Sequence, residues 1–179
     1  MTDAPVEGGK RRIDELMASG FTDDLGSLET DEIRRRRDMA RAELEYVSFL
    51  RRLVQGRRDI LRDELDRRRT DGATQDVLER VVSVLSEGTR GGSGGRAPTV
   101  PLPEDEIAMA RRRVEKLVGD TELSDLGTLS DERLEAAIGK LEEEERGVSD
   151  ARARVIQVHD ALQEEMKRRL KTQLSNLKP

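Results

Sequence analysis

Two stretches of the chain, 101 residues apart, carry the same kinds of polar side chain at matching spacing. The first copy consists of Ser48, Arg51, Gln55 and Asp59, and the second of Glu145, Ser149, Arg152 and Asp160. On a helix these positions fall within one strip about 80° wide. Arginine forks onto guanine O6 and N7, a carboxylate accepts from guanine N1–H and N2–H, and serine, glutamine or arginine holds phosphate. A guanine nucleotide would therefore satisfy every group in this polar strip.

The alternative is an ordinary solvated helix face, whose polar residues form i,i+4 pairs and bind no ligand. For one helix taken alone, this is the stronger interpretation. Recurrence of hydroxyl, guanidinium and carboxylate in register on a second helix favours a ligand, because a solvated face has no reason to repeat them. Five further groups near the strip either offset ligand phosphates or are simply solvated: Arg52, Arg57, Arg58, Arg154 and His159.

The polar strip belongs to a longer internal repeat. Residues 24–69 and 125–170 align without a gap and share 14 identities in 46 positions, beginning with DLGSL and DLGTL. Each repeat is expected to form a short helix, a turn at DLGxL and a long helix, which covers about 30–69 in the first repeat and about 130–173 in the second. Thr30 and Ser130 are the expected N-caps.

The repeats predict the domain organisation. We expect a first repeat at 1–87, a linker at 88–103 and a second repeat at 104–179. The first repeat would end in a connecting helix at about 74–87, where apolar residues follow a helical pattern. The linker combines a Gly/Ser-rich piece with a Pro-rich piece, which is typical of a spacer.

Apolar residues of the two long helices follow the 3-4-3-4 spacing of a coiled coil. The seam residues are Val47, Leu50, Val54 and Leu61, interrupted by Arg57, and then Val148, Ala151, Val155, Val158 and Leu162. The net charge is +4 over residues 30–69 and -3 over 131–170, so the two helices attract each other. The expected fold is all-α: two long helices forming an antiparallel coiled-coil hairpin, with short flanking helices.

In these polar residues the sequence resembles the RsiG family of actinobacterial anti-sigma factors, whose signature E-x3-S-x2-R-x3-Q-x3-D occurs once on each long helix. The first copy matches except that Leu44 stands where Glu is expected, and the second except that Ile156 stands where Gln is expected. The neighbouring Glu45 and Gln157 lie about 100° off the strip. They either substitute for the two missing groups, or those two contacts are absent.

The resemblance implies a function as well as a fold. It implies that both motif copies bind cyclic di-GMP, as an intercalated dimer, through the eight strip residues. It further implies that the loaded protein sequesters a WhiG-type sigma factor, related to flagellar sigma factors, and represses sporulation genes in a Streptomyces-like host. Cyclic di-GMP has two equivalent halves, which suits an antiparallel hairpin of two repeats. The alternative from another class is a nucleotide-free coiled-coil scaffold or protein-interaction module.

The amino-acid composition argues against several other classes of protein. With 40% charged and 2% aromatic residues, there is little material for the core of an ordinary enzyme. The chain has no cysteine and a single histidine, so we expect neither catalysis nor a metal site. A net charge of -5 disfavours direct DNA binding. No signal peptide and no apolar stretch approaching 18 residues is present, so a cytoplasmic protein without a membrane span is expected.

Two charge runs and several apolar residues have open roles. The run 34–37 is four arginines, which suits a nucleic-acid or partner surface, or more simply a solvated face. The run 142–145 is four glutamates, expected to be solvated rather than to converge on a cation. A sigma-factor contact needs exposed apolar surface, for which the candidates are Ile13, Leu16, Met17, Phe21, Leu25, Val77 to Leu85, Ile107, Met109, Val114, Leu117 and Val118. Equally, these residues would pack on the ends of the hairpin.

Overall fold

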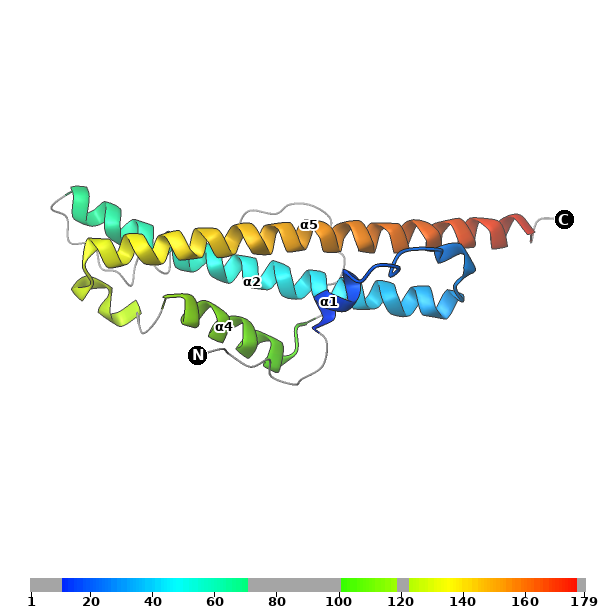
Figure 1. Ribbon diagram of the computed structural model, residues 1–179, viewed down its shortest axis with the longest axis horizontal. Helices are drawn as coiled ribbons and strands as arrows, with labels where there is room; N and C mark the ends of the chain where they lie inside the picture. The colour runs from blue at the N-terminus through cyan, green and yellow to red at the C-terminus, as the bar shows by residue number, and fades with distance from the viewer. Residues whose placement is uncertain (1–10, 71–100, 119–122, 177–179) are drawn as a thin grey trace. The chain divides into compact units, whose positions relative to one another are not determined.

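The computed structural model describes residues 11–70, 101–118 and 123–176. Every regular element in these ranges is helical: α1 (Arg12–Leu16), η1 (Leu25–Ser27), α2 (Thr30–Thr70), α4 (Glu104–Val118), η2 (Leu123–Thr128) and α5 (Asp131–Asn176) (Figure 1). The all-α fold predicted from the sequence is therefore confirmed. The expected connecting helix at about 74–87 and most of the linker at 88–103 lie outside the described residues.

The two long helices, α2 and α5, begin and end close to the predicted positions. Neither contains a proline, and each has two carboxylates in its first turn, where they suit the helix dipole. Ser130 is the N-cap of α5, because its Oγ accepts from the backbone N–H of Arg133 at 3.4 Å. The prediction for Thr30 was wrong. Helix α2 begins at Thr30 itself, whose hydroxyl accepts instead from the guanidinium of Arg169 at 2.9 Å.

Contacts divide the chain into two compact units, which cut across the sequence repeats. The terminal unit consists of Met1–Leu44 and Arg152–Pro179, and the central unit of Glu45–Ala151. The terminal unit therefore combines α1, η1 and the start of α2 with the end of α5. The central unit combines the end of α2 with α4, η2 and the start of α5. Each unit pairs the beginning of one repeat with the end of the long helix from the other.

Within each unit the segments of α2 and α5 pack antiparallel. In the terminal unit, Thr30 at the start of α2 contacts Arg169 near the end of α5. In the central unit, Arg69 at the end of α2 contacts Glu135 near the start of α5, with 2.6 Å between Nη2 and Oε1. These contacts confirm the predicted antiparallel pairing of the long helices.

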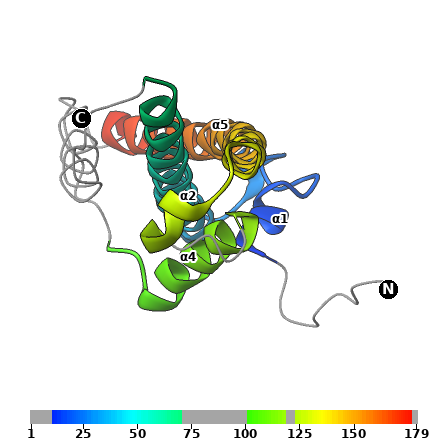
Figure 2. The same cartoon turned by 90° about the vertical axis from the view of Figure 1, so that its left-hand side faces the viewer.

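The predicted seam forms the core of both units. Seven of its nine apolar residues are buried, and Ala151 and Val158 are half-buried. In the terminal unit a cluster combines Val155 and Leu162 of α5 with residues of α1, the following turn and α2, namely Leu16, Phe21, Ile33 and Ala40. In the central unit, α4 lies beside the paired long helices (Figure 2), and its Ala110, Val114 and Val118 are buried. The interrupting Arg57 is half-buried. Burial lowers its pKa, and the charge of Glu115 on α4 opposes this.

An arginine near the end of each long helix binds the turn at the start of the other repeat. Arg169 donates to the backbone carbonyl of Leu25 at 2.9 Å in the terminal unit. Arg68 donates to the carbonyl of Leu126 at 2.6 Å in the central unit. The four residues are related by the 101-residue offset, so the DLGxL turns and these arginines form the same contact twice. Each of these carbonyls also accepts from a backbone N–H, that of Leu28 or Leu129 at 3.3 Å, so the guanidinium is its second donor.

Two buried glutamates bind these arginines, and their pKa values predict how the free energy of unfolding depends on pH. Glu64 bonds to Arg67 and Arg68, and these contacts lower its pKa to about 2. Glu165 bonds in the same way to Arg168 and Arg169, which lower its pKa to about 2 as well. Because the folded-state pKa lies below the unfolded value of 4.5, the stabilisation is complete above pH 4.5 and is lost as the pH falls towards 2. Urea unfolding between pH 7 and 2.5 should show this decline below pH 4.5.

Two single variants distinguish the effect of a buried, arginine-bound carboxylate from the general effect of acid on stability. Glu64→Gln should lower the free energy of unfolding at pH 7 and flatten its decline below pH 4.5. The exposed Glu143 on α5 provides the control, because Glu143→Gln removes the same charge and should leave the profile close to that of the wild type. An unchanged profile in Glu64→Gln would contradict the account of these arginine contacts.

Candidate functional site

Six of the eight predicted site residues lie in the central unit, on facing parts of α2 and α5. Ser48, Arg51, Gln55 and Asp59 lie along α2, and Glu145 and Ser149 lie on α5. All six are half-buried. The helical period of α2 puts its four residues on one side, as the spacing predicts. The central unit therefore contains the whole of the first motif copy and the beginning of the second.

Glu145 is the centre of the strongest set of contacts in this region. Its Oε1 accepts a hydrogen bond from Gln55 Nε2 at 2.6 Å, and its Oε2 accepts from the guanidinium of Arg58. Arg51 Nη2 lies 3.6 Å from Oε1 of the same carboxylate. Three predicted site residues, two from the first copy and one from the second, thus converge on one point between the two helices.

Arg58 connects this carboxylate to a second one. Its Nη2 lies 2.7 Å from Asp59 Oδ1, so it bridges Asp59 and Glu145. Burial acts to lower the Arg58 pKa, but the hydrogen bond with Asp59 and the charges of Asp59 and Glu145 outweigh it, and the pKa is raised. We call Arg51, Gln55, Arg58, Asp59 and Glu145 the Glu145 cluster. It holds two guanidiniums and two carboxylates and is electrically balanced.

Arg51 is a member of the cluster with unused hydrogen-bonding capacity at a buried atom. Its Nε is buried and has no hydrogen-bond partner among the described residues. The Arg51 side chain as a whole is 39% exposed. A buried N–H without an acceptor is costly in a folded protein. The arrangement suits a site in which a bound group supplies the acceptor.

The rest of the second copy, Arg152 and Asp160, lies in the terminal unit. Arg152 is half-buried on α5, while Asp160 is exposed, and its Oδ1 lies 3.3 Å from His159 Nδ1. The two positions that depart from the motif, Leu44 and Ile156, are also in this unit and half-buried. Leu44 packs against the apolar cluster of the terminal unit. The two regions of the strip therefore differ in chemistry.

Arg58 and the glutamate run 142–145 contribute more contacts to this region than their sequence pattern predicts. Arg58 was placed among groups near the strip, yet it binds Glu145 directly. Glu142 pairs with Arg62 of α2, and Glu144 lies 2.6 Å from Arg113 of α4. Three of the four glutamates thus bind arginines, so the expectation of a solvated face was wrong for them. The excess positive charge of α2 opposite this run was the available signal.

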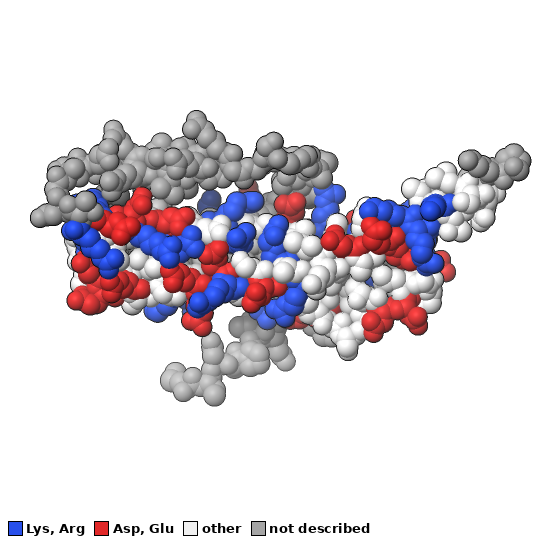
Figure 3. Space-filling view, turned by 90° about the horizontal axis from the view of Figure 1, so that it is seen from above, with Lys and Arg blue, Asp and Glu red and all other residues white. Residues whose placement is uncertain are grey.

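The run of four arginines at 34–37 is also paired, each member with a carboxylate of α2. Arg34 bonds to Asp31 at 2.8 Å, and Arg35 and Arg36 share Glu32. The fourth arginine lies 2.8 Å from the carboxylate next to it in sequence. On the face shown in Figure 3, basic and acidic side chains are interspersed rather than gathered by sign. This arrangement does not favour a nucleic-acid surface.

The apolar residues offered as sigma-factor contacts mostly pack inside the units. Leu16, Phe21, Val114 and Val118 are buried, and Ile13, Met17 and Leu25 pack against the terminal cluster; Ile107 and Leu117 are half-buried. Met109 alone of the described candidates is exposed, at 50%. Residues 77–85 lie outside the described residues.

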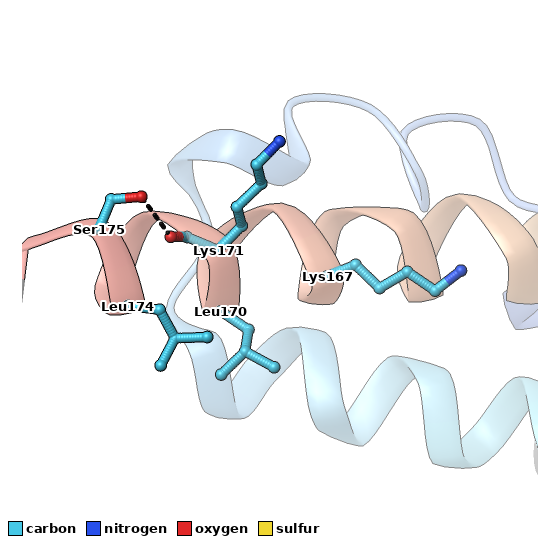
Figure 4. Close-up of a pocket in the computed structure, with 5 residues that line it drawn as sticks. All are labelled: Lys167, Leu170, Lys171, Leu174 and Ser175. Carbon is cyan, nitrogen blue, oxygen red and sulfur yellow. Dashed lines mark hydrogen bonds between the residues drawn. The ribbon is translucent and has the colours of Figure 1, made fainter.

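A shallow depression of about 300 Å³ lies near the end of α5. Leu170 and Leu174, each 57% exposed, point to one side of the helix there, whereas the amine of Lys171 points to the other (Figure 4). The depression is lined by residues of α5 only and contains no predicted site residue. Within the described ranges, no helix is both apolar enough and long enough to cross a membrane.

A comparison with known protein families finds a match to part of the chain. Residues 19–85 match the protein family whose model is described as RsiG-like. Over these residues the chain is RsiG-like. The match agrees with the resemblance drawn from the first motif copy, which lies inside these residues. No curated protein matches the chain.

The RsiG-like segment contains all four strip residues of α2, together with the first DLGxL turn. The likeness to this family suggests an anti-sigma factor role, with a sigma factor as the general class of partner. The family is regulatory rather than catalytic. The comparison concerns the first repeat, so the residues of α5 enter the site through their contacts with α2.

Proposed function

We propose that this chain is an anti-sigma factor that binds cyclic di-GMP through its two motif copies. When loaded, it sequesters a WhiG-type sigma factor and so represses sporulation and differentiation genes in the cytoplasm. The observation that carries the proposal is the Glu145 cluster, in which residues of both motif copies converge. The RsiG-like match supplies the general role of the protein, and the cluster supplies the ligand chemistry.

The chemistry of the cluster suits a guanine nucleotide. Arg51 and Arg58 are held by carboxylates, so their guanidinium planes are preorganised to stack on a base or to fork onto guanine O6 and N7. The unsatisfied Nε of Arg51 matches an acceptor on the ligand, such as a phosphate or a purine nitrogen. With only two Phe, one Tyr and no Trp in the chain, arginine planes must do most of the stacking.

One observation favours the alternative of a nucleotide-free scaffold. The Glu145 side chain is only 18% exposed, and its carboxylate is already bonded to Gln55 and Arg58. In a scaffold the cluster would serve only to join α2 to α5. That function predicts that Arg51→Ala changes no binding property of the protein, whereas the proposed function predicts a loss of nucleotide affinity.

Capture of the sigma factor tests the proposed function. Purified chain is mixed with a WhiG-type sigma factor, with and without cyclic di-GMP, and the mixture is analysed by size-exclusion chromatography. We expect a stable complex only when the nucleotide is present. A complex of equal yield with and without nucleotide, or none in either case, would contradict the proposal. Cyclic di-AMP at the same concentration is the control for a general effect of dinucleotides.

A further inference from the structure

Two leucines near the end of α5 are exposed, although the terminal unit has an apolar core. Leu170 and Leu174 are each 57% exposed, point to the same side of the helix and line the shallow depression described above (Figure 4). Residues four apart on a helix are neighbours on its surface. A single exposed apolar residue needs no explanation, whereas two adjacent leucines form an apolar patch that does.

The coiled-coil seam does not require leucine at these two positions. Continued past Leu162, the 3-4 spacing of the seam falls on Glu165 and Arg169, which bind each other at 2.8 Å. Arg169 also binds the DLGxL turn of the terminal unit. Leu170 and Leu174 follow Leu162 by eight and twelve residues, so they lie about 80° and 120° away from it around the helix. They therefore lie outside the seam.

The first repeat has a polar residue at the equivalent place. The counterpart of Leu170 at the 101-residue offset is Arg69, which forms an exposed ion pair with Glu135 at 2.6 Å. Exposed ion pairs contribute little to stability. A polar side chain is therefore sufficient at this place in the antiparallel pairing, and the leucine of the second repeat is not explained by the fold.

Positive charge flanks the two leucines. Residues 166–179 contain five Lys or Arg and no Asp or Glu. Lys167 and Lys171 line the same depression as the leucines. Lys171 forms no ion pair among the described residues, and Lys167 is paired with the exposed Glu164 of its own helix. Such an exposed pair is readily exchanged for another carboxylate, so the surroundings of the leucines suit an acidic partner.

We propose that Leu170, Leu174, Lys167 and Lys171 dock an acidic amphipathic helix of the sigma factor, an inference that rests on the proposed function for the identity of the partner. We call these four residues the α5 patch. Apolar residues of the docked helix pack on the leucines, and carboxylates at its edge meet the lysines. Two leucines bury far less than the ~1,000 Å² of a stable interface, so the α5 patch is one anchor within a larger contact.

Two other occupants fit the α5 patch less well. A second copy of the chain would bring two basic helix ends together, and like charges across an interface repel each other. An anionic membrane surface would attract the lysines, but interfacial helices insert a wide apolar face that commonly includes Trp or Phe. Residues 166–179 contain no aromatic residue, and the exposed apolar surface consists of two leucines. The charge and the size of the patch therefore favour a protein partner.

Titration of the sigma factor against a leucine variant tests the proposal. Full-length chain in excess cyclic di-GMP is titrated with a WhiG-type sigma factor in a calorimeter. Leu170→Gln plus Leu174→Gln should weaken the binding at least ~10-fold, because both apolar anchors are lost. Its helix content and Tm should match those of the wild type, because both positions are exposed. The matched control is Thr172→Ala plus Gln173→Ala, at exposed positions of the same turn, which should bind within about 2-fold of the wild type.

A charge reversal tests the acidic character of the partner helix. Lys171→Glu should weaken binding of the sigma factor ~5-fold or more at about 50 mM salt, and by less at about 500 mM, because salt screens exposed charges. An unchanged affinity of this variant at low salt would overturn the assignment of an acidic helix.

The remaining outcomes separate this inference from the proposed function. Equal affinity of the leucine variant and the wild type for the sigma factor would overturn the inference and leave the proposed function intact. If that variant instead loses self-association, or loses binding to phosphatidylglycerol vesicles, while its affinity for the sigma factor is unchanged, the α5 patch belongs to a second copy or to a membrane and the inference is overturned. Absence of any complex between the wild-type chain and the sigma factor would overturn both.

Discussion

Val155→Asp is expected to unfold the terminal unit. Val155 is 0% exposed and belongs to the apolar cluster that joins α5 to α1 and α2. An aspartate there would bury an unpaired carboxylate, which costs several kcal/mol, against a total stability of about 5–15 kcal/mol for a domain. We expect a loss of about 4 kcal/mol or more and a fall in Tm of at least ~10 °C. Circular dichroism during thermal unfolding measures both helix content and Tm.

Two companion variants make this test specific. Val54, the counterpart of Val155 in the repeat, is also 0% exposed, so Val54→Asp should have a similar effect through the central unit. Ala153 lies on the same helix as Val155 but is exposed, so Ala153→Asp should change the free energy of unfolding by only about 0.5 kcal/mol. Equal losses in the Val155 and Ala153 variants would show that the seam is not the core.

Arg51→Ala combined with Arg152→Ala is expected to abolish high-affinity nucleotide binding. The two arginines are the same residue of the two motif copies, and both are half-buried rather than part of the core. A hydrogen bond to a charged group contributes about 1.5–3 kcal/mol, so losing two should weaken cyclic di-GMP binding by at least ~100-fold. Isothermal titration measures the affinity, and circular dichroism checks that the helices remain.

A control with the same change in charge separates specific contact from general attraction of an anion. Arg34 and Arg112 are exposed and lie outside the strip, so Arg34→Ala plus Arg112→Ala also removes two positive charges. This variant should bind cyclic di-GMP within about 3-fold of the wild type, because exposed charges are screened by salt. Equal losses in the two double variants would argue against recognition by Arg51 and Arg152.

Much of the fold could be predicted because long-range repetition and helical periodicity act together. Proline-free runs with a 3-4-3-4 seam predicted α2 and α5 to within a few residues, and opposite net charges predicted their pairing. The cap at Thr30 could not be predicted correctly. Its hydroxyl is taken by Arg169, a residue 139 positions away, and no local pattern indicates such a partner.

The candidate site was predicted in its residue types but not in its internal contacts. Helical geometry placed Ser48, Arg51, Gln55 and Asp59 on one face, as the structure shows. That Gln55 binds Glu145, and that Arg58 joins Glu145 to Asp59, depends on the axial register of two helices distant in sequence. Register is set by the packing of the whole seam, so a motif on one helix carries no information about it. The 101-residue offset was the feature that connected the two.

Titration of the wild-type chain with cyclic di-GMP tests the central claim most directly. The measurement is made by calorimetry with the chain alone and with a WhiG-type sigma factor, using GMP and cyclic di-AMP as controls. The account predicts saturable binding of cyclic di-GMP in at least one of these two conditions, and no comparable binding of either control. Absence of any heat of binding with cyclic di-GMP in both conditions would contradict it.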